Sequence, residues 1–149
     1  AGAFDPEAYS AALVELLEPF LPDLVVMAGF MTRLAAPVLD RWPVVNVHPA
    51  LLPAFGGEGF YGHHVHEAVL DAGVKLTGAT VHFADGEYDR GPIIAQEPVT
   101  VLEDDTPDSL AARVQEAERR VYPRAIALVA SGRVRVEGKR ARILTGEDA

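Results

Sequence analysis

Hydrophobic and polar positions along the first third of the chain follow two periods, one typical of helices and one typical of buried strands. Short, continuous apolar runs occupy residues 23–30 and 43–49, as expected for strands that are buried on both faces of a parallel sheet. Before and between these runs, apolar residues recur at helical spacing and predict helices over 5–20 and 32–42. This alternation of helix and strand predicts an α/β fold with right-handed crossovers.

The signals at the start of the first helix are specific. Asp5 stands at the N-cap position and Pro6 at the first helical position. An apolar face of this helix is expected from Leu13, Leu16, Leu17 and Phe20, and Pro22 is expected to end the helix.

The remainder of the chain predicts a mixed or antiparallel continuation of the sheet. Residues 49–62 are rich in Pro and Gly and predict a loop. After this loop we expect a helix over 63–73 that Gly73 ends, followed by antiparallel strands over 75–85 and 91–101. A long helix is expected over 106–132, with Thr106 as its N-cap and a kink at Pro123. A terminal hairpin over 133–144 is expected to turn at Glu137 and Gly138.

The chain is interpreted as one domain over residues 1–149, since no linker, repeat or low-complexity tract divides it. It opens on a helix, whereas doubly wound domains open with a strand and a Gly-rich turn. We therefore expect the first strands of a larger sheet to be missing from this sequence.

Composition excludes several classes of function. The net charge is −9, from 13 basic and 22 acidic residues, which disfavours nonspecific nucleic-acid binding. No apolar run approaches the roughly 20 residues that span a membrane. The absence of cysteine excludes disulfides, cysteine nucleophiles and thiolate metal sites, and favours a reducing cytoplasm.

The stretch "VVNVHPALLPAFGG" holds the only asparagine of the chain, Asn46, two residues before His48. Ligands of open α/β sheets bind beyond the carboxyl ends of strands, and residues 85–89 follow another predicted strand. An Asn, a His and an Asp that meet there suit catalysis: the amide is a neutral donor for a developing oxyanion, and the imidazole can donate or accept a proton near pH 7. A nearby carboxylate would orient the imidazole and favour its protonated form.

Structural roles for these residues remain open at this point. An Asn at a strand end often caps a turn, a His before Pro is often a structural hydrogen bonder, and Asp89 lies in an ordinary-looking acidic turn. No Ser stands in a Gly-x-Ser-x-Gly elbow, so direct attack of one substrate on another fits better than a covalent intermediate.

A cluster of three histidines, His63, His64 and His66, raises the question of a metal site. His63 and His66 are three residues apart on the predicted helix, beside His64, but no carboxylate or further His stands at a convincing ligand spacing. We expect no metal, and expect one of these histidines to line the pocket. His82 alternates within a strand and is expected to be a packed or surface residue.

The segments "AGFM", "NVHPALLPAF" and "GATVHFADGEYDRGPIIAQ" together resemble the glycinamide ribonucleotide (phosphoribosylglycinamide) formyltransferases, folate-dependent enzymes of purine synthesis. The resemblance runs from about residue 3 to residue 132. It implies a Rossmann-like, three-layer α/β/α formyltransferase fold without its N-terminal part. It also implies transfer of a formyl group from 10-formyltetrahydrofolate to the amine of glycinamide ribonucleotide.

The resemblance also implies roles for individual residues. Asn46 and protonated His48 would stabilise the tetrahedral oxyanion, while Asp89 would support His48 and help to move the proton. Met31, Thr32, Arg33, Leu34 and Leu39 match the wall of the folate pocket, and the backbone of Ala84, Asp85, Gly86 and Glu87 matches the loop that binds the pterin. Gln115, Glu118, His64 and His66 match positions near the second substrate, with Glu118 close to its amine.

The sequence also departs from the family pattern. A member of the family has Met-Arg-Ile-Leu where this chain has Met31, Thr32, Arg33 and Leu34, which leaves the contact of Arg33 with the folate tail open. The family's Gly-rich loop for the ribose phosphate has no counterpart, so we expect weak or no transferase activity from residues 1–149 alone.

Two other functions remain as alternatives. Formyltetrahydrofolate hydrolases and methionyl-tRNA formyltransferases share the Asn-His-Asp trio, although the acidic charge argues against a tRNA partner. A non-catalytic folate-binding module is the third interpretation. We expect small-molecule substrates, no membrane or nucleic-acid partner, a monomer or a homodimer, and a cytoplasmic location.

Overall fold

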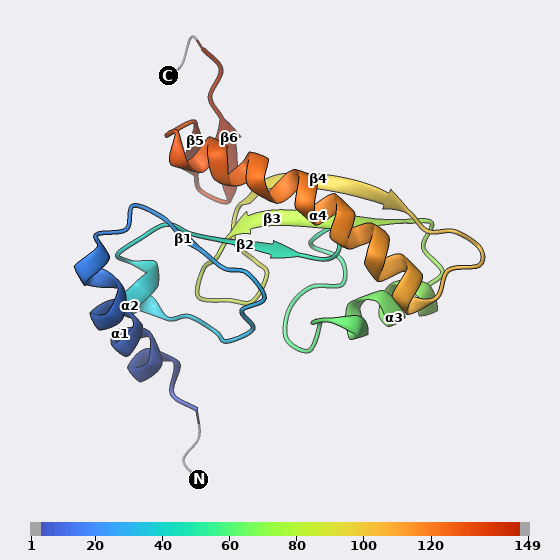
Figure 1. Cartoon of the computed structure of the whole chain (residues 1–149), viewed down its shortest axis with the longest axis horizontal. Coiled ribbons are helices and arrows are strands. Elements are labelled where there is room, and N and C mark those ends of the chain that lie inside the picture. Colours follow the sequence, from blue (N-terminus) through green and yellow to red (C-terminus); the bar gives the residue numbers. More distant parts are fainter. Residues whose placement is uncertain (1–3, 147–149) are drawn as a thin grey trace.

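The computed structural model describes residues 4–146 and has a mixed four-stranded sheet at its centre. Strands β1 and β2 are parallel, and β3 and β4 follow as antiparallel neighbours in the order β1-β2-β3-β4 (Figure 1). The predicted α/β fold, with parallel strands followed by an antiparallel part, is confirmed. The strands are β1 (Val25–Val26), β2 (Val44–His48), β3 (Leu76–Phe83) and β4 (Ile93–Thr100).

Helices cover both faces of the sheet, which gives three layers. Side chains alternate along a strand, so Val44 and Val45 of β2 point to opposite faces. Val45 joins the main apolar core with residues of the long helix, whereas Val44 packs against Leu34 and Val38 and against the first helix. The helices are α1 (Pro6–Leu17), the short 3₁₀ helix η1 (Glu18–Phe20), α2 (Ala36–Leu39), α3 (His63–Asp71) and α4 (Pro107–Ala130).

The predicted helix signals act as expected at three ends. The Asp5 carboxylate accepts hydrogen bonds from the backbone N–H of Glu7 and Ala8. Thr106 and Ser109 form a reciprocal capping box at the start of α4, which continues through Pro123. Gly73 follows α3 with a φ of 67°, a left-handed conformation that favours glycine.

Three predicted elements differ from the structure. The strand expected over 23–30 is limited to Val25–Val26, because the chain turns away at Gly29 (φ 64°). The helix expected over 32–42 is the single turn of α2. Leu16 of α1 and Phe20 of η1 are exposed rather than part of the packed face, which is formed by Tyr9, Leu13 and Val14.

A polar stripe runs across β2 and β3 on the face opposite α4. The antiparallel register sets Asn46 opposite His82 and His48 opposite Thr80, so these side chains share one face. Thr80 anchors the loop 49–62 over this face: its hydroxyl donates to the carbonyl of Ala50 and accepts from the N–H of Leu52. The face away from α4 therefore carries this polar stripe beneath loops, next to the apolar part around Val44 that α1 and α2 cover.

The chain ends in a hairpin of β5 (Val134–Glu137) and β6 (Arg140–Ile143), joined by a two-residue turn at Gly138 and Lys139. Its inner side chains Val134 and Ala141 pack against the main core. Across residues 4–146, no helix is both long and apolar enough to cross a membrane.

Candidate active site

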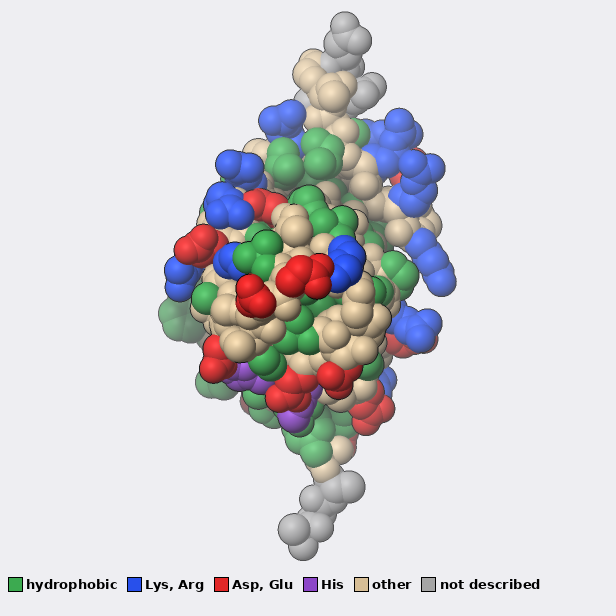
Figure 2. Space-filling view, turned by 90° about the vertical axis from the view of Figure 1, so that its right-hand side faces the viewer, with side chains coloured by type: hydrophobic (Ala, Val, Ile, Leu, Met, Phe, Trp, Pro, Cys, Tyr) green, Lys and Arg blue, Asp and Glu red, His purple; other side chains and the backbone are tan. Residues whose placement is uncertain are grey.

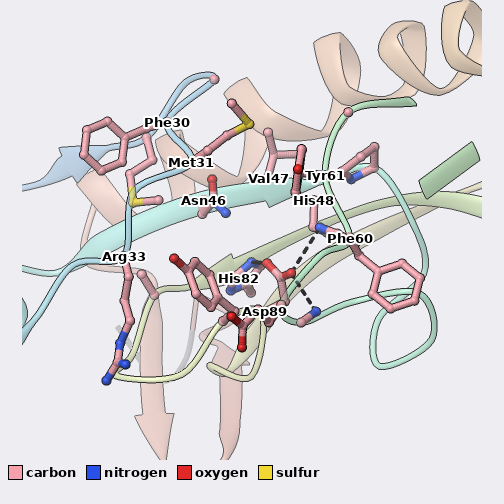
Figure 3. Close-up of a pocket in the computed structure, with 18 of the residues that line it drawn as sticks. Phe30, Met31, Arg33, Asn46, Val47, His48, Phe60, Tyr61, His82 and Asp89 are labelled. Carbon is pink, nitrogen blue, oxygen red and sulfur yellow. Dashed lines mark hydrogen bonds and ion pairs between the residues drawn. The ribbon is translucent and has the colours of Figure 1, made fainter. Parts of the chain in front are cut away.

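A cavity of about 720 Å³ opens on the polar face of the sheet, at the ends of β1 and β2. Its volume lies within the range of small-molecule sites, about 300–1,000 Å³. Seven segments line it: the loop after β1, the end of β2, the Gly-rich loop before α3, the start of α3, the end of β3, the loop between β3 and β4, and the first half of α4. Figure 3 shows Asn46, His48, His82 and Asp89 on one side, with Phe30 and Met31 facing them.

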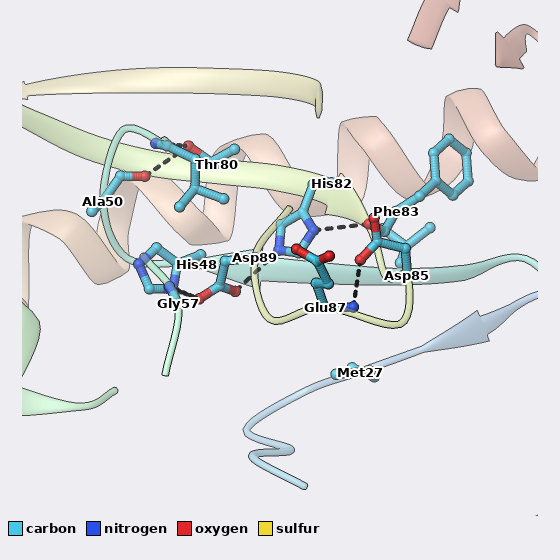
Figure 4. A network of polar contacts seen from close by, with 12 residues as sticks. Met27, His48, Ala50, Gly57, Thr80, His82, Phe83, Asp85, Glu87 and Asp89 are labelled. Atoms are coloured by element: carbon cyan, nitrogen blue, oxygen red, sulfur yellow. Dashed lines mark hydrogen bonds and ion pairs between the residues drawn. The ribbon is translucent and has the colours of Figure 1, made fainter. Parts of the chain in front are cut away.

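The centre of the site is a contact between His48 and Asp89. His48 Nδ1 lies 3.3 Å from Asp89 Oδ2, and both side chains are largely buried. The other ring nitrogen, Nε2, lies 2.7 Å from the carbonyl oxygen of Phe55 and donates to it when protonated. Both nitrogens of His48 thus face acceptors, which fixes the orientation of the ring. Figure 4 shows His48 beside Asp89.

Asp89 reaches His48 by a route that the sequence did not predict. Because β3 runs antiparallel to β2, the carboxyl end of β3 lies beside Val45, at the amino end of β2. The carboxyl ends of these two strands therefore do not meet. Instead, the loop after β3 returns over the sheet face and delivers Asp89 to His48.

The backbone of Asp89 is held in an unusual conformation. Its φ is 56°, in the left-handed region that residues other than glycine rarely adopt. The N–H of Gly57 donates to Asp89 Oδ2 at 3.0 Å, and a Cβ on Gly56 would lie 3.3 Å from the Cβ of Asp89. Such backbone outliers persist where surrounding contacts over-determine them, and they cluster at functional sites.

His82 is the clearest residue that sequence reasoning missed. It is 2% exposed, it lines the cavity, and its Nε2 lies 3.5 Å from Asp89 Oδ1. That distance lies beyond an ordinary hydrogen bond, and Nε2 has no other partner among the described residues. Its Nδ1 donates to the carbonyl of Phe83 at 2.9 Å. The expectation of a packed residue is correct, but it omitted the contact with Asp89.

Burial sets the protonation of this group of side chains. Loss of water lowers the pKa of His48 below its ordinary value, and Asp89 and the Phe55 carbonyl oppose that shift without reversing it. Burial by itself would raise the pKa of Asp89, but His82, His48 and the Gly57 N–H hold it below its ordinary value. Burial thus favours the neutral form of His48, beside a carboxyl group of Asp89 whose contacts favour its ionised form.

Asn46 does not cap a turn. It lies in the middle of β2 and lines the cavity, half-buried. Its side-chain amide makes no hydrogen bond within residues 4–146, so the N–H₂ group is available to a ligand. The structure therefore removes the turn-capping interpretation that the sequence left open.

The residues matched to a folate pocket divide into two groups. Met31, Thr32, Arg33 and Leu34 line the cavity after β1, and Ala84, Asp85 and Glu87 line it from the loop between β3 and β4. Leu39 and Gly86 are not in the lining. Leu39 packs instead with Val38 and Val44 in the second apolar cluster.

The residues matched to the second substrate also divide. Gln115 and Glu118 of α4 and His66 of α3 line the cavity. Burial raises the pKa of Glu118, partly offset by Arg119. His64 is not in the lining; it is exposed and pairs with Glu67 at 3.4 Å. Four aromatic lining residues, Phe30, Phe60, Tyr61 and Tyr88, received no role from the sequence, although Phe30 and Tyr88 lie within the segments that resemble the family.

The histidines near α3 do not gather around a common point. His63 Nδ1 lies 3.5 Å from Asp108, His64 pairs with Glu67, and His66 is buried. Figure 2 shows histidine side chains among acidic ones on this side of the molecule. Among the residues that the structure describes, no group of three His, Cys, Asp or Glu side chains is placed to hold a metal ion.

Comparison with known proteins adds to this geometry. The chain is 46% identical over 138 residues to the trifunctional purine biosynthetic protein adenosine-3 of Bos taurus, covering 91% of this chain and 13% of that protein. It superposes on the crystal structure of glycinamide ribonucleotide transformylase 1 from Symbiobacterium toebii with a TM-score of 0.86 and 45% identity, covering 93% of this chain and 64% of that one.

A relative with a different activity shares the fold. A formyltetrahydrofolate deformylase from Pseudomonas syringae superposes with a TM-score of 0.83 and 29% identity, covering 95% of this chain and 46% of that one. The chain thus spans less than two thirds of the length of each of these three relatives. Residues 2–126 match the formyl transferase family, and the chain belongs to that family.

Proposed function

We propose that this chain carries the formyl-transfer site of a phosphoribosylglycinamide formyltransferase, which transfers the formyl group of 10-formyltetrahydrofolate to the amine of glycinamide ribonucleotide. The observation that carries the proposal is the contact of His48 with Asp89 in one cavity with the unpaired amide of Asn46. The similarity to the Symbiobacterium transformylase supports it.

The reaction needs a neutral nucleophile and a path for one proton. The amine nitrogen bonds to the formyl carbon, the bond from that carbon to N10 of the folate breaks, and one proton passes from the amine to N10. The His48–Asp89 pair takes up that proton, because Asp89 and the Phe55 carbonyl then each face a ring N–H of the imidazolium. His48 returns the proton to the leaving nitrogen.

Asn46 has the complementary role. Negative charge develops on the formyl oxygen as the amine attacks, and a fixed neutral donor stabilises it without a change in charge. The Asn46 side chain suits this role because it extends from a strand of the sheet, and its N–H groups donate to no protein acceptor among the described residues.

Residues of α4 suit the amine substrate. Glu118 lines the cavity from α4, and a carboxylate there attracts an ammonium group. The raised pKa of Glu118 makes its carboxylate a stronger base than usual, which favours removal of the extra proton that an ammonium carries. Gln115, one turn earlier, offers both a donor and an acceptor.

The cavity also fits a folate. Met27, Phe30, Met31 and Leu34 supply an apolar wall for a flat heterocycle, and Asp85 and Glu87 lie on the loop opposite. When bound, 10-formyltetrahydrofolate supplies the electrophilic carbon. Arg33 lines the cavity with a charge that suits the glutamate carboxylates of a folate tail.

Hydrolysis of formyltetrahydrofolate is the second candidate, because the Pseudomonas deformylase has the same fold. The two differ only in whether water or an amine attacks. An assay of the protein that carries this chain distinguishes the two activities. It compares water, glycinamide ribonucleotide and methionyl-tRNA as acceptors of the formyl group. Transfer to glycinamide ribonucleotide in large excess over release of formate supports the proposal, and the reverse ratio supports the deformylase.

Substitution of His48 tests the catalytic assignment. His48→Ala should lower the transfer rate by about 10²–10⁴, the usual contribution of a positioned acid–base group. The measurement is the rate of tetrahydrofolate formation, with His64→Ala as a control because His64 lies outside the cavity lining. A His48→Ala protein within tenfold of wild type would refute the role of His48.

For the surroundings of the protein we propose small-molecule substrates, a monomer or homodimer, and a cytoplasmic location. The cysteine-free composition supports a reducing compartment.

A further inference from the structure

Tyr122 of α4 joins parts of the chain that are far apart in sequence. Its phenol oxygen lies 2.6 Å from the carbonyl oxygen of Met27 and 2.9 Å from the carbonyl oxygen of Val45. Met27 N–H also donates to the Val45 carbonyl at 2.9 Å. One hydroxyl thus ties the long helix to β2 and to the residue that follows β1.

The two carbonyls belong to the parts of the chain that lead into the catalytic side of the cavity. Met27 lines the cavity and is followed by the loop of Phe30, Met31 and Leu34, which forms the apolar wall. Val45 immediately precedes Asn46. The position of the Tyr122 hydroxyl is therefore coupled to the formyl-donor side of the site through the backbone.

On the helix, Tyr122 shares a face with the residues of the other side. Gln115, Glu118 and Tyr122 are spaced by three and four residues, so their side chains lie in one row along α4. Gln115 and Glu118 both line the cavity. Besides apolar packing, α4 bonds to β4 through Arg113 and Arg120, at the other edge of the sheet from β1. Among the described residues, Tyr122 makes the only hydrogen bonds from α4 to the β1 and β2 side of the sheet.

We infer that Tyr122 is a positioning residue: its hydroxyl fixes the α4 side of the cavity relative to the strand ends, and so aligns the amine acceptor with the formyl donor. This inference rests on the proposed function, because it assigns the two substrates to the two sides of one cavity. Effects of this kind are large, since a misplacement of about 1 Å can cost on the order of 10² in rate.

The hydroxyl retains its proton over the working range of an enzyme. Burial, together with the nearby Glu118, raises the pKa of Tyr122 to about 12, against the opposing hydrogen bond to Met27. The phenol therefore donates to the two carbonyls from acid to alkaline pH, and the position of α4 relative to β2 does not change with pH through this group.

Tyr122→Phe tests the inference because it keeps the ring and removes only the hydroxyl. Tyr9→Phe is the matched control, since Tyr9 is also half-buried and its hydroxyl makes no hydrogen bond within residues 4–146. Three quantities are measured in the protein that carries this chain: the single-turnover transfer rate, the dissociation constants of glycinamide ribonucleotide and of a non-transferable folate analogue, and amide hydrogen exchange over residues 26–34.

A positioning role predicts a rate about 10- to 100-fold lower in Tyr122→Phe, faster exchange over 26–34, and unchanged dissociation constants for each substrate alone. The Tyr9→Phe protein should match wild type in all three. An unchanged rate in Tyr122→Phe overturns the inference, and so does a rate that falls only in proportion to weaker binding of both substrates. Absence of transfer in wild type would instead count against the proposed function, while the exchange over 26–34 still tests the Tyr122 bond.

Discussion

At the scale of single residues, the site depends on side chains whose hydrogen-bonding capacity the fold leaves unused. The Asn46 amide has no partner in residues 4–146, and His82 Nε2 has only the long contact with Asp89. Polar groups at or near the interior are usually satisfied, so unused capacity that faces a cavity marks the place where a ligand completes the network.

Asn46 gives the sharpest single-residue prediction. Asn46→Ala removes the amide donor and should lower the transfer rate by about 10²–10³. Asn46→Asp is nearly isosteric, but it adds a negative charge where the formyl oxygen becomes negative, so its rate should be lower still. Single-turnover kinetics of both variants check this order. A mild effect of Asn46→Asp would return Asn46 to a purely structural role.

Thr77 offers a prediction about stability alone. Its hydroxyl is buried within β3, at 1% exposure, and has no hydrogen-bond partner among the described residues. Thr77→Val replaces the hydroxyl with a methyl group of similar shape and removes the cost of an unsatisfied polar group, about 1–3 kcal/mol. Urea unfolding should therefore show a raised free energy of unfolding with an unchanged m-value, and a less stable variant would contradict this reasoning.

At the scale of elements, the loop between β3 and β4 determines where the Asp89 carboxylate lies. Gly91 lies against the backbone of Phe83, where an added Cβ would be 1.7 Å from the carbonyl oxygen. The β3–β4 register also shifts between Val81 and His82, at the level of the site. Bulges of this kind redirect side chains and are frequent beside active sites.

Gly91→Ala should therefore displace the loop that carries Asp89. We expect a loss of roughly 1–3 kcal/mol in the free energy of unfolding, as in other overpacked sites, together with loss of transfer activity. Gly86→Ala in the same loop is the stability control, because its Cβ would meet no atom within 4 Å. Equal unfolding midpoints for the two variants would show that the close approach at Gly91 is easily relaxed.

The elements also show what the sequence was able to predict. Capping residues and helical spacing located α1, α3 and α4, and alternation located β3 and β4, because these signals are local. Tertiary contacts decide three features that local signals did not predict. These are the short β1, the exposure of Leu16 and Phe20, and the position of Asp89 beside His48. Asn46 was conspicuous as the only asparagine, whereas His82 required the strand register that sets it opposite Asn46.

At the scale of the whole molecule, charge is unevenly distributed. Residues 119–144 contain eight basic side chains and one acidic side chain, in a chain with 13 and 22 overall. Lys and Arg accordingly gather towards the C-terminal end of the molecule in Figure 2, and acidic side chains towards the opposite end. His63, which lines the cavity, lies among these acidic groups beside Asp108. An acidic surrounding favours the approach of a cationic amine to the cavity.

The response of the whole fold to pH follows from its buried titratable groups. Burial lowers the pKa of His48 below the ordinary value of 6.5. Burial also lowers the pKa of His66 below that value, and the nearby His63 and His48 lower it further. The unfolded chain therefore binds more protons than the folded protein as pH falls below about 6.5, and the free energy of unfolding should decrease there. The pKa of Glu118 is raised in the folded protein, so above pH 4.5 this carboxyl group binds more protons in the folded protein than in the unfolded chain. Glu118 therefore makes the free energy of unfolding depend less steeply on pH.

Urea titrations between pH 8 and pH 5 measure this effect directly. The free energy of unfolding should be nearly constant above the ordinary histidine pKa and should fall as pH decreases below it, since folding then excludes protons that the unfolded histidines bind. His66→Gln keeps a polar side chain but cannot titrate, so its curve should be flatter than that of wild type whatever its absolute stability. Parallel curves for the two proteins would mean that His66 is as easily protonated in the fold as in the unfolded chain, and that burial at 4% exposure does not control its charge.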